Sequence, residues 1–264
     1  MRTIGISTTK RRKWLRSWIP LLCLVPGAAL LPADSLGAEA ECLAIEQAFA
    51  HNNVATLKNL VPSKPQWQAL KQFRLAAAYI PADENKAALQ AVRNGLKTVK
   101  RALQADPHDT EMLIMGAMLD GQYVLLRRWR FFLNGRRGLR RLNRAEAQQP
   151  NNPRIALVRG TAKFLLPGIL GGNAKEAQAT FFRALYQHPD SFAQSVLCRD
   201  GQWAQVDLLN WLARSYQENG DPEQAQATFA QALEHSPDNH WVRLAMAGEG
   251  YEWQPESGEL NQNE

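Results

Sequence analysis

Seven residues with the same spacing occur twice in the second half of the chain. One copy consists of Phe164, Gly168, Gly172, Ala177, Phe181, Ala184 and Pro189, and the other of Leu212, Tyr216, Gly220, Ala225, Phe229, Ala232 and Pro237. Apolar residues around them recur at intervals of three and four, which is typical of amphipathic helices. The spacing predicts pairs of helices in which small residues allow close approach and a proline ends the second helix.

This spacing resembles that of the tetratricopeptide repeat (TPR). Further helix stops at Pro107 and Pro150 indicate four hairpins, at about 66–107, 108–150, 154–190 and 206–239. One such hairpin cannot bury its own apolar face, so the hairpins must stack. The resemblance implies an all-α, right-handed superhelical solenoid of about four TPR-like hairpins. It also implies a protein that binds a protein partner and is not an enzyme.

Residues 1–40 have the pattern of an export signal. Four basic residues at 10–13 precede an apolar run at 18–31, and Ala38 and Ala40 fit a cleavage site after Ala40. We expect a cleaved signal peptide and a periplasmic protein. An alternative is an inner-membrane anchor formed by residues 18–31. The Arg11-Arg12 pair leaves open whether the signal is of the twin-arginine or the general secretory type.

The remainder of the chain divides into three parts. We expect an N-terminal capping helix in 41–65, the repeat domain in 66–249 and a flexible tail in 250–264. Residues 1–40 account for +4 of the formal net charge of +6, so the rest of the chain does not have the charge expected of a nucleic-acid-binding protein. After cleavage two cysteines remain, Cys42 and Cys198, which would either form a disulfide bond in an oxidising compartment or stay separate buried thiols.

The third hairpin departs from a plain repeat in its first helix. Leu166-Pro167-Gly168-Ile169-Leu170-Gly171-Gly172-Asn173 places a proline where the helix would otherwise continue, which predicts a bend or an early end. This segment resembles the T-component proteins associated with TRAP-type solute transporters. That resemblance implies an exported TPR protein linked to solute uptake, with a hydrophobic cleft and a periplasmic protein partner.

A partner-binding groove is expected on the concave face of the third and fourth hairpins. Its predicted residues are Leu166, Ile169, Leu170, Asp207, Asn210, Arg214 and Gln217. Apolar residues would anchor the partner and polar residues would orient it. The alternative is that the apolar residues pack on a neighbouring helix and the polar residues are solvated.

Arginines are concentrated in the second hairpin, in a stretch without an acidic residue from position 121 to 145. They are Arg127, Arg128, Arg130, Arg136, Arg137, Arg140, Arg141 and Arg144. Such a run favours an anionic neighbour. Arg136, Arg137, Arg140 and Arg141 are the predicted contacts to an anionic membrane surface. Alternatively, the arginines bind an acidic protein face or pair with Glu111, Asp120 or Glu146 of adjacent helices.

No motif for catalysis or for metal or cofactor binding was found. The five histidines do not have metal-ligand spacing, and there is neither a phosphate-binding loop nor a nucleophile elbow. The sequence therefore predicts a non-catalytic periplasmic scaffold without a cofactor or metal. The alternative function is a binder of a small apolar ligand or lipid at the membrane surface. The sequence does not indicate the oligomeric state.

Overall fold

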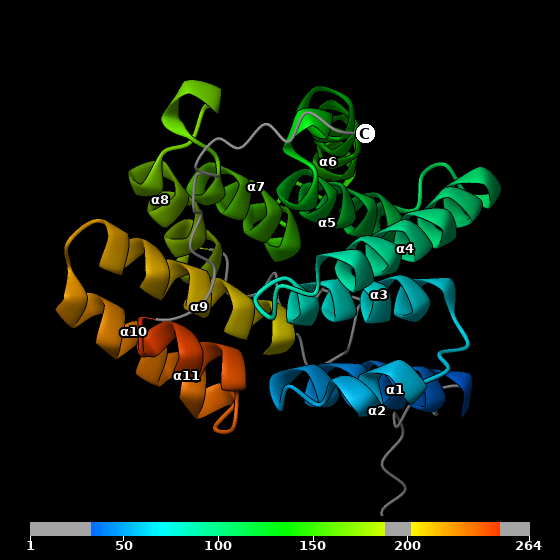
Figure 1. Ribbon diagram of the computed structural model, residues 1–264, viewed down its shortest axis with the longest axis horizontal. Helices are drawn as coiled ribbons and strands as arrows, with labels where there is room; N and C mark the ends of the chain where they lie inside the picture. The colour runs from blue at the N-terminus through cyan, green and yellow to red at the C-terminus, as the bar shows by residue number, and fades with distance from the viewer. Residues whose placement is uncertain (1–32, 188–201, 249–264) are drawn as a thin grey trace, which may run out of the picture. The chain divides into compact units, whose positions relative to one another are not determined.

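The computed structural model describes residues 33–187 and 202–248 (Figure 1). The predicted membrane anchor at 18–31, Pro189, Cys198 and the predicted tail at 250–264 lie outside these residues. Every regular element within the described ranges is helical, and they contain no β-strand. The expectation of an all-α fold is confirmed.

Four helix pairs follow one another along the chain. They are α3 (Pro65–Tyr79) with α4 (Asn85–Ala105), α5 (Thr110–Leu126) with α6 (Arg136–Gln148), α7 (Pro153–Leu165) with α8 (Ala174–Tyr186), and α9 (Gln202–Glu218) with α10 (Pro222–His235). Successive pairs pack on each other, as a repeat fold requires (Figure 1). A short helix, α11 (His240–Met246), follows the last pair.

The segment before the first pair contains two helices, α1 (Ala33–Ala50) and α2 (Val54–Asn59), where one capping helix was expected. The break lies at Asn52, which has a left-handed backbone (φ 51°), and Asn53 then caps α2 by accepting a hydrogen bond from the Thr56 amide at 3.0 Å. Asparagine tolerates both roles better than most residues. Helix α1 begins ahead of the predicted cleavage site after Ala40.

A glycine, an aspartate and a proline form the turn of the fourth hairpin. Gly220 has a positive φ of 81°, and Asp221 accepts a hydrogen bond from the Gln224 amide at 3.1 Å. Pro222 occupies the first turn of α10. The glycine supplies the left-handed conformation, and the aspartate caps the new helix.

In the third hairpin the two glycines have separate roles. Helix α7 ends at Leu165, just before Pro167, so the predicted early end is confirmed. Gly171, not Gly172, adopts the left-handed conformation, with φ 91°. A Cβ on Gly172 would lie 1.6 Å from the Leu166 carbonyl oxygen, so that position has no room for a side chain. Asn173 caps α8 through the Glu176 amide.

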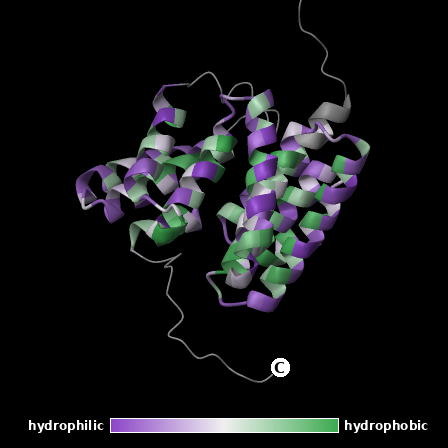
Figure 2. Ribbon diagram, turned by 90° about the horizontal axis from the view of Figure 1, so that it is seen from above, coloured by the Kyte–Doolittle hydropathy of each residue, from purple (hydrophilic) through white to green (hydrophobic). Residues whose placement is uncertain are grey.

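Residues at the repeated positions form much of the core. Ala177, Phe181, Ala225 and Phe229 are fully buried, and a contiguous apolar cluster extends from α1 to α11. Hydrophobic and hydrophilic residues alternate around the helices, as amphipathic packing requires (Figure 2).

The first and last helices of the described residues contact each other. The Phe49 ring of α1 stacks on Trp241 of α11, with 5.1 Å between centroids. Trp241 Nε1 also donates a hydrogen bond of 2.8 Å to the Phe49 carbonyl oxygen. The expected N-terminal cap therefore packs not only on the first hairpin but also on the helix that follows the last one.

Candidate functional site

A buried arginine joins three helices at one end of the predicted groove. Arg74 of α3 donates hydrogen bonds to both carboxylate oxygens of Glu46 in α1, at 2.9 and 2.8 Å, and to Asp207 Oδ2 in α9 at 2.9 Å. Its guanidinium also lies over the Phe49 ring, 4.4 Å from the centroid. Asp207, predicted to face a partner, instead bridges α9 to α3.

Burial dominates the protonation of this cluster. Desolvation raises the pKa of Glu46 and of Asp207, and Arg74 offsets this effect only in part. The two carboxylates in turn raise the pKa of Arg74, whose positive charge is therefore permanent. A cluster with one cation and two acids is suited to holding helices together, and it leaves little of the Asp207 side chain exposed for a ligand.

The other predicted groove residues fall into two sets. Asn210, Arg214 and Gln217 follow Asp207 on α9 and are half-buried, and Arg214 lies near the Trp211 ring. Leu166 is half-buried at the end of α7, whereas Ile169 and Leu170 are exposed on the short turn η3 (Gly168–Leu170). The four polar residues therefore lie on α9, whereas the three apolar residues lie at the end of α7 and on the turn that follows it.

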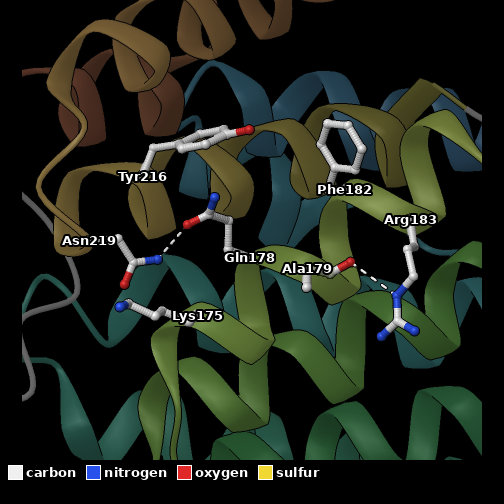
Figure 3. Close-up of a pocket in the computed structure, with 7 residues that line it drawn as sticks. All are labelled: Lys175, Gln178, Ala179, Phe182, Arg183, Tyr216 and Asn219. Atoms are coloured by element: carbon white, nitrogen blue, oxygen red, sulfur yellow. Dashed lines mark hydrogen bonds between the residues drawn. The ribbon is translucent and has the colours of Figure 1, made fainter.

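A hollow of about 530 Å³ lies between α8 and α9. Figure 3 shows its lining, which consists of Lys175, Gln178, Ala179, Phe182, Arg183, Tyr216 and Asn219. It is open to solvent, and among the described residues it is the larger of the two hollows identified. We call it the α8–α9 groove.

Aromatic rings and cations are combined in this groove. Tyr216 and Phe182 present their rings from opposite helices, and Lys175 and Arg183 lie on α8 (Figure 3). No carboxylate within the described residues forms an ion pair with either cation. Such a surface suits a segment that carries an acidic group beside an apolar side chain.

Polar contacts fix the walls of the α8–α9 groove. Asn219, the residue that follows α9, donates a hydrogen bond to Gln178 of α8, and Arg183 Nε donates to the Ala179 carbonyl oxygen at 3.2 Å (Figure 3). Beyond Arg183, the Tyr186 hydroxyl donates to Gln231 Oε1 at 2.9 Å, which ties α8 to α10. Two of these bonds, from Asn219 and Tyr186, join α8 to the last hairpin, and the groove is present without a bound partner.

None of the residues lining this groove was among the predicted site residues. Phe182 directly follows the buried Phe181, and its ring lies 4.8 Å from that of Tyr186, both exposed. Two aromatic residues four positions apart on the exposed side of a helix are a sequence signal for an interaction surface, and Phe182 and Tyr186 provide it. Whether α9 would provide the opposite wall depended on how the hairpins pack.

The second hollow, of about 410 Å³, lies between α2, α3 and α4 and is lined by both polar and apolar residues. Lys71 lies there with its ammonium group donating to the carbonyl oxygens of Lys58 and Leu60, at 2.7 and 2.6 Å. The lysine thus satisfies the carbonyl groups at the end of α2, which is a structural role.

The four arginines predicted to contact an anionic surface divide into two pairs. Arg137 and Arg141 turn inward and both pair with Asp120 of α5, which is fully buried. Arg136 and Arg140 are exposed. The first pair neutralises a buried acid, one of the alternatives that the sequence left open, and the second pair is exposed to a partner.

Cys42 of α1 is fully buried and forms a disulfide bond. The other two cysteines of the chain, Cys23 and Cys198, lie outside the described residues. The pairing of Cys42 with Cys198 therefore remains a prediction.

Within residues 33–187 and 202–248, no three His, Cys, Asp or Glu side chains are grouped so that they could hold a metal ion. None of the helices there is long and apolar enough to cross a membrane.

Comparison with known proteins agrees with the architecture. Residues 206–248, which include α10 and α11 and most of α9, match the tetratricopeptide repeat family. The chain is similar to the crystal structure of a thermophilic TPR protein of Thermus thermophilus, with a TM-score of 0.51 and 17% identity over 81% of this chain and 97% of that one. The fold is that of a TPR protein. No curated protein matches the chain in sequence.

Proposed function

We propose that this protein is a non-catalytic TPR adaptor that binds an acidic, partly apolar segment of a partner protein in the α8–α9 groove. The observation that carries the proposal is the groove itself, in which two aromatic rings and two cations line a preformed hollow between adjacent hairpins. TPR hairpins commonly provide such surfaces because stacking leaves extended faces free for other chains.

The partner's chemistry follows from the lining. Lys175 and Arg183 would attract a carboxylate, and Phe182 and Tyr216 would cover an apolar or aromatic side chain. Because both cations lie on α8 with Phe182 nearby, the bound segment would run along that helix.

Photo-crosslinking in cells tests this site. A crosslinking residue at Phe182 should capture one partner, whereas the same residue at Gln226, exposed on α10, should not. Changing Lys175→Glu together with Arg183→Glu should abolish capture at Phe182. In a binding assay with the purified partner, the double variant should weaken affinity by about ten-fold or more, because a cation–carboxylate contact becomes a like-charge contact. Equal capture at both positions, or no effect of charge reversal, would exclude this groove as the site.

We also propose that the adaptor acts in the periplasm. The basic and apolar pattern of residues 1–40 supports export, and N-terminal sequencing of the protein from a periplasmic fraction should begin at Glu41. An intact N-terminus in the membrane fraction would instead support the anchor at 18–31.

A link to TRAP-type solute transport rests on the resemblance of residues 166–173. If it holds, the partner captured at Phe182 should be a solute-binding protein of such a transporter. A captured partner of another class would remove the transport link and leave the adaptor role intact.

A further inference from the structure

The connection between α5 and α6 exposes several large apolar side chains. Trp129 is 69% exposed, Phe132 72%, Leu133 63% and Leu139 52%. The first three lie on two short helical turns, η1 (Arg128–Arg130) and η2 (Phe131–Gly135), and Leu139 lies near the start of α6. Residues 127–140 are here called the hairpin 2 tip. Isolated exposed apolar residues are ordinary, but four within so short a segment indicate an interaction surface.

Local contacts hold these side chains outward. The Arg130 guanidinium lies 4.1 Å from the centre of the Trp129 ring, and the rings of Phe131 and Phe132 meet edge to face at 5.6 Å. Asn134 is buried and anchors the middle of the segment. The exposed rings are therefore part of a packed turn.

Positive charge surrounds the apolar side chains. Arg127, Arg136 and Arg140 are exposed, and the sequence has no acidic residue between 121 and 145. The nearest preceding acid, Asp120, is fully buried and paired with both Arg137 and Arg141. Its negative charge is thus already compensated, and the hairpin 2 tip has a net positive charge.

We infer that the hairpin 2 tip docks on an anionic phospholipid surface. Tryptophan favours the headgroup region of a bilayer, phenylalanine and leucine insert at its boundary with the acyl chains, and arginines are drawn to anionic headgroups. A bilayer accepts several protruding rings at once, whereas a protein partner would need a matching pocket for each. Neither of the two hollows described above includes a residue of the tip. This surface is separate from the α8–α9 groove, so the inference does not depend on the proposed protein-binding role.

Vesicle binding by the full chain tests the inference. Flotation is measured with phosphatidylcholine vesicles and with an equimolar mixture of phosphatidylcholine and phosphatidylglycerol. The first variant combines Arg127→Gln, Arg136→Gln and Arg140→Gln, and leaves the Asp120 pairs intact. The second combines Trp129→Ser, Phe132→Ser and Leu133→Ser. A matched control, Arg93→Gln with Lys97→Gln and Lys100→Gln, removes the same charge from the exposed side of α4.

Wild type and control should bind the anionic vesicles much more tightly than the neutral ones. The arginine variant should lose on the order of 100-fold in affinity, about five-fold for each charge. The apolar variant should lose about ten-fold or more. All variants share residues 1–32, so any contribution of that segment to binding is common to them.

Hydrogen exchange gives a readout confined to the tip. Anionic vesicles should slow exchange in residues 127–140 of wild type and of the control, but not in either tip variant. Unchanged vesicle binding by both tip variants, or no protection of 127–140, would overturn the inference. The same measurement with soluble polyglutamate tests the alternative of an acidic protein partner. Protection of the tip by polyglutamate but not by anionic vesicles would assign the surface to an acidic protein and exclude the membrane.

Discussion

At Arg74 the chain buries one positive charge between two negative ones. The side chains of Arg74, Glu46 and Asp207 are 4%, 14% and 21% exposed, and they come from three different helices. Such a cluster carries a desolvation cost, so its net contribution to stability is small as long as it is complete. Removing one of the three side chains lowers stability much more, because the remaining charges stay buried without a counter-ion.

Arg74→Met should therefore lower the free energy of unfolding by about 3–5 kcal/mol at neutral pH, since Glu46 and Asp207 lose their shared counter-ion. Chemical denaturation of the variant and wild type measures this loss. Arg93→Met, at an exposed position of α4, is the control and should stay within about 0.5 kcal/mol of wild type. Similar losses of unfolding free energy in both variants would show that the ion pairs of Arg74 do not contribute to stability.

The same cluster predicts a pH dependence. Because burial raises the pKa of Glu46 above its ordinary value of 4.5, the folded protein holds this proton over a pH range in which the unfolded chain has lost it. Stability from this group is thus present at low pH and declines as pH rises from about 4.5 through the raised pKa. Glu46→Gln removes the titration. Denaturation at a series of pH values should show wild type losing stability relative to Glu46→Gln as pH rises, and a constant difference would contradict the raised pKa.

Among the elements, the turn between α7 and α8 shows that the repeat pattern locates a turn but does not identify its left-handed residue. The glycine at the repeat position is Gly172, yet the left-handed residue is Gly171. Gly172 is needed because the chain folds back against Leu166 there. Pro167 causes the difference, since it ends α7 early and forces an additional 3-10 turn before α8 begins.

Two alanine substitutions test whether Gly172 is required because its position has no room for a side chain. Gly172→Ala should destabilise the protein by about 1–3 kcal/mol, because its Cβ would clash with backbone atoms that cannot rotate away. Gly168→Ala, four residues earlier in the same turn, meets no atom within 4 Å and should change stability by less than about 1 kcal/mol. The two melting temperatures, measured side by side, check the prediction, and equal shifts would contradict it.

At the scale of the whole molecule, the contact between α1 and α11 links the two ends of the described chain. Trp241 provides both the stacking contact and the hydrogen bond to Phe49. Together with the Arg74 cluster, it makes α1 a part of the fold that both the first and the last hairpins depend on.

Trp241→Ala should lower the free energy of unfolding by about 3 kcal/mol and speed up hydrogen exchange in α1, far away in sequence. Met246→Ala, at an exposed position of α11, should leave exchange in α1 unchanged. If Trp241→Ala affected only α11, the two ends would be shown to fold independently of each other.

The repeat architecture of this protein follows from local patterns in its amino-acid sequence. Recurring small and aromatic residues in the third and fourth hairpins dictate where helices approach and pack, and prolines mark helix ends along the chain. Phe181 and Phe229, for example, are both fully buried, and Asp221 caps its helix.

Only the tertiary structure decided which surfaces remain free. Asp207 and Arg141 look like surface residues in the sequence, but packing places a counter-ion from another helix beside each of them. The α8–α9 groove needs side chains from two hairpins, so neither helix pattern alone could reveal it. The physical reason is that burial and charge pairing depend on neighbours distant in sequence, whereas helix formation and capping depend on residues within a turn or two.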